Sequence, residues 1–157
     1  MVERLAKIFN DKDGDLKALA YALVDAPEAW DALLGKMRSP FDFTLAARRA
    51  TLRQPLAEAG PVLNPLNVMG KPLWQPGGPN GFPDIAAAWT SAEGIKLRLD
   101  MAAQMARQIK DITNPSDLLN EIIGEAASAE TRQAVARAAS REQGLALLFM
   151  SPEFQRR

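Results

Sequence analysis

The residues best suited to chemistry lie between residues 72 and 89, where aromatic rings alternate with polar side chains. Trp74, Phe82 and Trp89 supply the rings. Asn80 and Asp84 supply an amide and a carboxylate between them. An aromatic platform with polar edges can stack a sugar ring or a peptide and bond its rim. These five side chains are therefore candidates for a ligand-binding site, although the sequence favours the simpler interpretation that the rings pack in the core.

A second candidate is the basic stretch 36–53, in which five Lys and Arg residues face a single acid, Asp42. Arg48, Arg49 and Arg53 fall within one expected helix, and Arg49 and Arg53 share a face of it. Such a face can hold phosphates or another anion. The sequence nevertheless favours a solvated or ion-paired helix surface as the interpretation of the same residues.

Much other chemistry is excluded by composition. The chain has 157 residues with no His and no Cys, so it lacks the side chain that titrates near neutrality, the commonest metal ligand and the thiolate nucleophile. We expect no catalytic residues, no metal and no cofactor. Its 19 basic residues balance its 19 acidic residues, which leaves no net field to attract a polyanion. We therefore expect no nucleic-acid partner.

The elements that must position these residues are helices. The chain holds 27 Ala and 19 Leu, whereas Val, Ile and Thr total 17, a balance that favours helix over strand. Small polar residues followed by proline are typical of helix starts. Four such pairs are Ser39-Pro40, Asn64-Pro65, Asn114-Pro115 and Ser151-Pro152. We predict helices over 2–9, 15–25, 27–34, 40–58, 65–69, 91–111, 115–124, 129–139 and 141–150, with a short turn from 152.

The segment 91–111 has the clearest helical periodicity. Ile95, Leu99, Ala102 and Ala106 recur at steps of three and four, as a helix facing the core requires. Between the two helical parts lies an aromatic strap, expected over 60–90. Residues 60–83 hold six of the eleven Pro and five of the ten Gly. We expect the strap to be ordered and packed against the helices. Exposure of its aromatic rings would lose the stabilisation that burial of their apolar surface provides.

Several segments together resemble a bacterial family catalogued as domain of unknown function 1800. They span nearly the whole chain and match the C-terminal portion of longer family chains. The resemblance implies a predominantly helical fold and carries over no catalytic residues. The matching segments are DGDL at 13–16, APEAW at 26–30, KMRSPFDF at 36–43, MGKPLW at 69–74, the PGGPNGFP run at 76–83, Trp89, RLDMA at 98–102 and SPEFQ at 151–155.

These observations predict a single all-α domain over 1–157, a compact helical bundle with the strap and no significant β-sheet. We expect a non-catalytic structural or interaction domain. The alternative is a binding site for a small ligand or carbohydrate, conceivably hydrolytic, built on the 72–89 strap. The apolar residues Val2, Leu5, Ala6 and Phe9 predict an N-terminal helix that needs a partner.

Three partners are open for that helix: a missing N-terminal region of the same architecture, another protein, or a second copy of the chain. The sequence has no membrane span and no export signal of its own. The compartment is therefore undetermined, with the cytoplasm as the default and export the alternative for a fragment.

Overall fold

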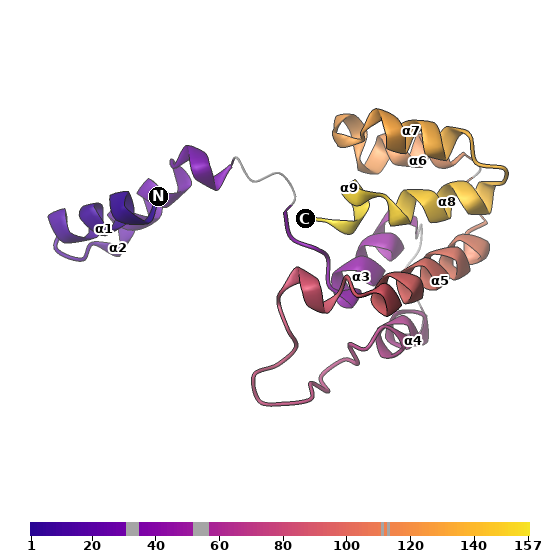
Figure 1. Ribbon diagram of the computed structural model, residues 1–157, viewed down its shortest axis with the longest axis horizontal. Helices are drawn as coiled ribbons and strands as arrows, with labels where there is room; N and C mark the ends of the chain where they lie inside the picture. Colours follow the sequence, from indigo (N-terminus) through magenta and orange to yellow (C-terminus); the bar gives the residue numbers. More distant parts are fainter. Residues whose placement is uncertain (31–34, 52–56, 111, 113) are drawn as a thin grey trace. The chain divides into compact units, whose positions relative to one another are not determined.

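The computed structural model describes residues 1–30, 35–51, 57–110, 112 and 114–157, and within these ranges the protein is all-α (Figure 1). The described residues contain no strand; one isolated antiparallel bridge joins Met37 and Arg156. The predicted fold class is therefore confirmed. The chain divides into two compact units, Met1–Gly35 and Lys36–Arg157, and each is described by itself below. A single domain over 1–157 stays a prediction.

The first unit is a helical hairpin of α1 (Val2–Asp11) and α2 (Leu16–Val24), followed by the short 3-10 helix η1 (Pro27–Ala29). Gly14 has a φ of 79°, in the left-handed region that residues with a Cβ rarely adopt, so glycine suits this turn. The side chain of Asp15 caps α2 by accepting hydrogen bonds from the backbone N–H groups of Lys17 and Ala18.

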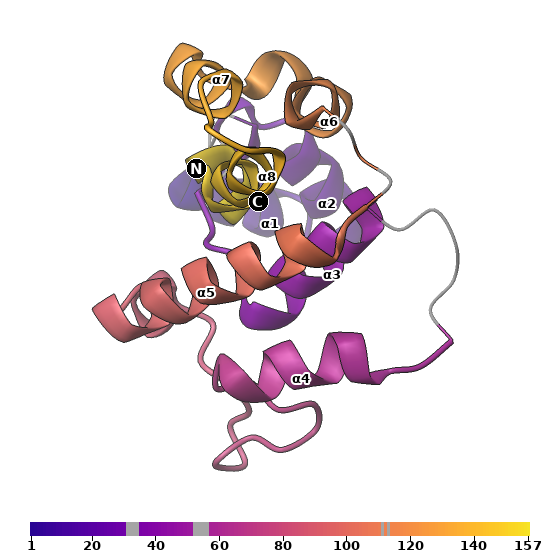
Figure 2. The ribbon, with the colours of Figure 1, turned by 90° about the vertical axis from the view of Figure 1, so that its right-hand side faces the viewer.

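The second unit contains the remaining elements (Figures 1 and 2). They stack in one direction, from α6 and α7 through α8 to α5 and α3, with α4 on the far side. Their bounds are α3 Pro40–Thr51, α4 Gly60–Val68, η2 Ala86–Ala88, α5 Ala92–Gln108, α6 Pro115–Ile122, η3 Gly124–Ala126, α7 Ala129–Ala136, α8 Arg141–Met150 and α9 Pro152–Gln155.

The core of this unit forms where α5 packs against α8 and α3. Ala102 and Ala106 of α5, Leu148 and Phe149 of α8, and Phe43 of α3 are all fully buried. Close packing of this kind supplies the main stabilisation of a helical domain. The segment 91–111, predicted as a helix that faces the core, therefore contributes to its centre.

The buried face of α5 differs from the prediction in its first half. Ile95 and Leu99 were expected in the core, but they are 37% and 51% exposed, whereas Arg98 is 1% exposed. A helix can bury only one stripe, and Arg98 turns inward because it donates hydrogen bonds to the Gln155 side chain and the Arg38 carbonyl. Periodicity alone cannot reveal such bonds.

Helix α4 is also longer than predicted. Asn64-Pro65 was expected to start a helix, but α4 begins at Gly60 and Pro65 lies inside it. Pro65 lacks the N–H that would bond the carbonyl of Pro61. The Nη2 atom of Arg48 donates to that carbonyl instead, at 3.1 Å, which satisfies the backbone at the break. The first nine residues of the expected strap are therefore helical, and its irregular part begins after Val68.

Most predicted helix caps are found. The side chains of Asn114, Ser128 and Ser151 accept hydrogen bonds from backbone N–H groups in the first turns of α6, α7 and α9. Helix α5 is capped by Ser91, whose side chain accepts a hydrogen bond from the backbone N–H of Gly94. Within the described ranges, no helix combines the length and the apolar character needed to cross a membrane.

Candidate functional site

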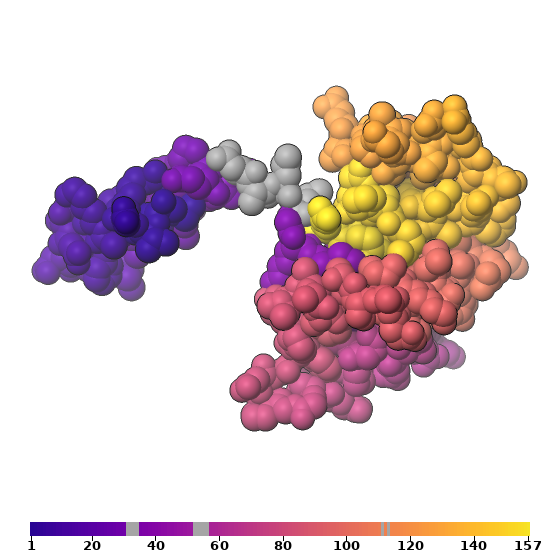
Figure 3. Space-filling model, viewed as in Figure 1, coloured from indigo at the N-terminus to yellow at the C-terminus, as the bar shows by residue number. Residues whose placement is uncertain are grey.

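The strap carries an apolar pocket of about 320 Å³. It lies where residues 71–76 and 82 meet α3 and α4, and Figure 3 shows the strap at the surface of the second unit. A pocket of this size can accept one side chain or a small molecule. Its walls are Phe41, Leu66, Lys71, Pro72, Leu73, Trp74, Pro76 and Phe82.

Trp74 is the most unusual residue of this strap pocket. Its side chain is 89% exposed, although a tryptophan ring normally gains stability by burial. Its backbone φ is 61°, in the left-handed region that costs roughly 1–2 kcal/mol for a residue with a Cβ. The chain therefore bears strain to present a ring that the described residues leave uncovered.

Lys71 connects the two other aromatic residues of the predicted site. Its Nζ lies 5.7 Å from the ring centre of Phe82 and 5.6 Å from that of Trp89, which are cation–π distances. Phe82 is half-buried and lines the strap pocket. Trp89 is only 8% exposed and faces a neighbouring pocket of about 260 Å³ that Arg98 also lines.

The two polar residues of the predicted site do not line the strap pocket. Asp84 accepts a hydrogen bond from Nζ of Lys36 at 2.5 Å, and this contact lowers the pKa of the Asp84 carboxyl. Asn80 is exposed. Of the five predicted residues, the structure brings Trp74 and Phe82 together in one pocket, and Lys71 links Phe82 to Trp89.

The three predicted anion-binding arginines have different surroundings. Arg48 is half-buried and lines a pocket between α4 and α5, while Arg49 is exposed and does not line it. Arg53 lies outside the described residues. Lys36 and Arg38, from the same basic stretch, lie at the N-terminal end of the second unit, which pairs with its C-terminal end as described next.

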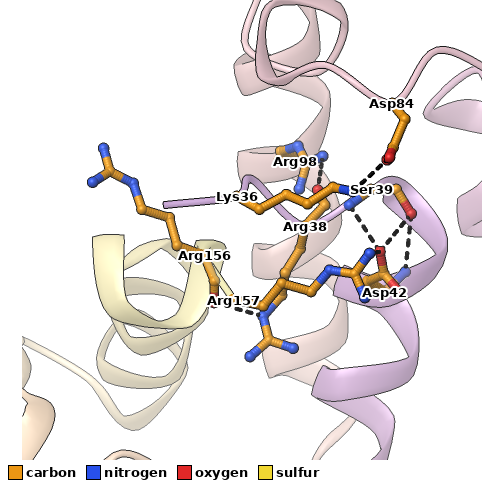
Figure 4. Close-up of polar contacts among 8 residues, drawn as sticks. All are labelled: Lys36, Arg38, Ser39, Asp42, Asp84, Arg98, Arg156 and Arg157. Atoms are coloured by element: carbon orange, nitrogen blue, oxygen red, sulfur yellow. Dashed lines mark hydrogen bonds and ion pairs between the residues drawn. The ribbon is translucent and has the colours of Figure 1, made fainter. Parts of the chain in front are cut away.

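The two chain ends of the second unit are paired, and we call this pairing the seam, residues 36–38 with 155–157. Backbone hydrogen bonds run in both directions between Lys36 and Arg157, at 3.1 and 2.9 Å, and from Arg38 N–H to the Gln155 carbonyl at 2.8 Å. Figure 4 shows the basic side chains gathered here. Asp42 lies 3.4 Å from Arg157, so this charge excess is partly neutralised.

Arg98 lies buried beneath the seam. Its Nη1 donates to Oε1 of Gln155 at 2.9 Å and its Nη2 to the backbone carbonyl of Arg38 at 2.7 Å. Its guanidinium also stacks 5.4 Å from the ring centre of Phe43. Burial lowers the pKa of Arg98 to about 10, so it stays charged at neutral pH. These contacts give Arg98 a structural role.

Three of the segments that carry the family resemblance meet at this point. Arg98 comes from the RLDMA segment, Arg38 and Phe43 from the KMRSPFDF segment, and Gln155 from the SPEFQ segment. Their combination across the chain therefore reflects one buried cluster. Phe154 joins it, with its ring centre 6.2 Å from that of Phe43.

The pocket between α4 and α5, which we call the Arg48 pocket, was not predicted. It has a volume of about 360 Å³, and three of its walls are the amides of Asn64, Gln104 and Gln108. Gln104 and Gln108 lie one turn apart on α5, interleaved with Met101 and Met105. That spacing is visible in the sequence. The sequence does not show that α4 lies opposite α5, because the two helices are separated along the chain.

Metal binding finds no support in the parts of the chain that the structure covers, where no three acidic side chains form a group able to hold an ion. The chain matched no curated protein and no solved structure. One family profile, described as protein of unknown function (DUF1800), matches residues 1–156. Nearly every residue is covered by that match, and the chain belongs to the DUF1800 family.

Proposed function

We propose that this chain is a non-catalytic binding domain whose strap pocket holds an apolar side chain of an extended peptide from a partner protein. One observation carries the proposal: Trp74 is held 89% exposed on a left-handed backbone at the edge of an apolar pocket. Strain of this kind is characteristic of functional positions. Exposed tryptophan beside a hydrophobic pocket is also the side chain most often found at binding hot spots.

The composition of the pocket favours a peptide over a sugar. Its walls are aromatic, aliphatic and proline side chains, with Lys71 as the one charged member. A sugar needs several convergent hydrogen-bonding groups, whereas Asn80 and Asp84 are not among the walls. An apolar side chain needs only a desolvated pocket, and the flanking peptide backbone can lie against Trp74.

A non-catalytic role agrees with the charged groups. The chain has no His and no Cys, so general acid-base chemistry would fall to a carboxyl with a raised pKa, a lysine or Tyr21. The resolved shifts of the carboxyls run the other way. The pKa values of Asp84 and Glu142 are lowered by hydrogen bonds from Lys36 and Arg141, so both carboxyls stay ionised at neutral pH.

The proposal can be tested by fluorescence anisotropy with fluorescein-labelled octapeptides that carry a single Leu, Phe or Trp at the centre of a Ser/Gly background. At least one should bind saturably. Trp74→Ala and Phe82→Ala should each weaken it by roughly thirtyfold, the effect of losing a hot spot of about 2 kcal/mol. Leu99→Ala is the matched control, because Leu99 is 51% exposed and lies outside the pocket.

Two results would overturn the proposal. One is the absence of binding by every peptide in the series, and the other is equal weakening by Leu99→Ala and Trp74→Ala. A soluble oligosaccharide should be titrated in parallel. If it binds in a Trp74-dependent manner while the peptides do not, the carbohydrate alternative replaces the peptide.

A further inference from the structure

Arg48 is fixed in place at one end of the Arg48 pocket. Its Nη2 donates to the Pro61 carbonyl at 3.1 Å and to Oε1 of Gln108 at 3.4 Å. The first bond occupies the carbonyl that Pro65 leaves free in α4. Because these contacts come from two different helices, they hold the guanidinium between α4 and α5.

The same guanidinium has an unsatisfied donor. The Nε of Arg48 is buried and has no hydrogen-bond partner among the described residues. A buried donor on a charged group without an acceptor costs about 1–3 kcal/mol or more. Nε itself is closed to solvent, so an acceptor in the pocket would meet the guanidinium at the atoms of Arg48 that line it. A carboxylate is the acceptor that best matches an arginine fork.

The rest of the pocket is polar along one side and apolar along the other. Asn64, Gln104 and Gln108 offer amides that both donate and accept. Val68, Met101 and Met105 supply apolar surface. The pocket volume of about 360 Å³ falls within the range of small-molecule sites.

The charged residues of the pocket favour a ligand with no net charge that carries one positive and one negative group. Among the described residues that line the pocket, Arg48 is the one cation and Glu58 the one anion. A phosphate or a nucleic-acid backbone would meet repulsion from Glu58 with a single arginine to offset it. A zwitterion can satisfy both residues at once.

From these contacts we propose that the Arg48 pocket binds a small zwitterion, namely a free amino acid or a dipeptide. Its carboxylate bonds to Arg48 and its ammonium group lies toward Glu58. The amides bond the remaining polar atoms, and an apolar side chain rests on Met101 and Met105. This site is separate from the strap pocket and does not depend on the peptide proposed there.

The first measurement is thermal-shift screening of the full chain with the twenty free amino acids and a set of alanyl dipeptides, followed by isothermal titration of the best compound. Its C-terminal amide and its N-acetyl derivative should each bind at least about tenfold more weakly, because each loses one charge contact. Inorganic phosphate and pyrophosphate are titrated in parallel. Failure of every amino acid and dipeptide, or tighter binding by phosphate, would overturn the proposal.

The variants rely on two adjacent arginines with different surroundings. Arg48→Gln should weaken the best compound at least about tenfold, while Arg49→Gln should leave its affinity unchanged, because Arg49 is exposed and lies outside the pocket. Gln104→Ala provides a second test if Arg48→Gln does not fold, since Gln104 is an exposed wall residue. It should weaken binding severalfold. Equal effects of Arg48→Gln and Arg49→Gln, or wild-type affinity in Gln104→Ala, would refute the site.

Discussion

Arg98 and Gln155 form a buried hydrogen bond of 2.9 Å that joins the middle of α5 to the last turn of α9. Gln155 is 5% exposed, and its Nε2 donates in turn to the Phe149 carbonyl at 2.7 Å. One amide thus satisfies a buried cation on one side and a helix-end carbonyl on the other. Loss of that amide should therefore be felt at both places.

We expect Gln155→Leu to lower the free energy of unfolding by about 2–4 kcal/mol, because it leaves a buried charged donor and a backbone carbonyl without partners. Urea unfolding followed by circular dichroism measures this change. Gln75→Leu, at an exposed strap position, should change stability by less than about 0.5 kcal/mol. Similar stabilities for the two variants would show that the Arg98 bond contributes little.

Stability should depend on pH through Glu153. Partial burial raises the pKa of this carboxyl, but hydrogen bonds from Ser128 and Thr131 outweigh that effect and lower it to about 2. A lowered folded-state pKa gives stability that is complete above the unfolded-state value near 4.5 and is lost as the pH falls toward 2.

Glu153→Gln isolates this contribution. The wild type should exceed the variant by about 1–2 kcal/mol at pH 7, after allowance for solvent screening. The difference should shrink between about pH 4.5 and 2, as measured by urea midpoints. Glu130→Gln, at an exposed position of α7, serves as the control. A difference that stays constant across this pH range would contradict the assignment.

Trp74 and Trp89 should respond oppositely to removal. Trp74→Gly removes an exposed ring and relieves a left-handed backbone, so the free energy of unfolding should stay the same or rise by up to about 1 kcal/mol. Trp89→Ala removes a ring that is 8% exposed and should cost about 3–5 kcal/mol. Thermal unfolding compares them. A large loss of stability in Trp74→Gly would mean that the ring is structural rather than a binding element.

Arg48 and Pro65 should be energetically coupled. Arg48→Met leaves the Pro61 carbonyl unsatisfied, whereas Pro65→Ala restores a backbone N–H that can bond it. The cost of Arg48→Met should therefore be about 1 kcal/mol smaller in the Pro65→Ala background. A double-mutant cycle by urea unfolding gives this coupling energy, and purely additive effects would contradict the bond at 3.1 Å.

We expect the first unit to drive self-association of the chain, because its apolar residues are exposed. Val2 and Leu16 are 80% and 69% exposed, and Ala26 is the only buried hydrophobic residue described in this unit. We expect concentration-dependent association in sedimentation velocity, weakened by Val2→Lys and Leu16→Lys. Ile85→Lys in the second unit, at a position 64% exposed, should leave it unchanged. A strict monomer at high concentration would exclude this role.

Local chemistry made much of the fold predictable. The all-α class follows from the Ala and Leu content, and the caps at Asn114, Ser128 and Ser151 depend on bonds within one helical turn. The inward turn of Arg98 was missed because its partners lie 57 and 60 residues away. The start of α4 was missed because a distant arginine compensates for Pro65.

The candidate sites also divide into features that depend on local sequence and features that depend on long-range contacts. The aromatic character of the strap was predictable, since Trp74 and Phe82 lie within one short segment. The Arg48 pocket could not be predicted, because its walls come from the three helices α3, α4 and α5. The pattern of residues within one helix does not predict which other helix packs against it. The sequence grouped Arg48 with Arg49 and Arg53 as one basic patch; exposure distinguishes Arg48 from Arg49.

The seam also bears on the order in which the second unit folds. Arg38 and Arg156, which it joins, lie 118 residues apart along the chain, whereas the contacts between α7 and α8 are local. Closing so long a loop costs more chain entropy than forming neighbouring helices. We therefore expect the helices α5 to α8 to assemble first and the seam to close last. Substitutions at Arg38 should then accelerate unfolding while leaving the refolding rate almost unchanged.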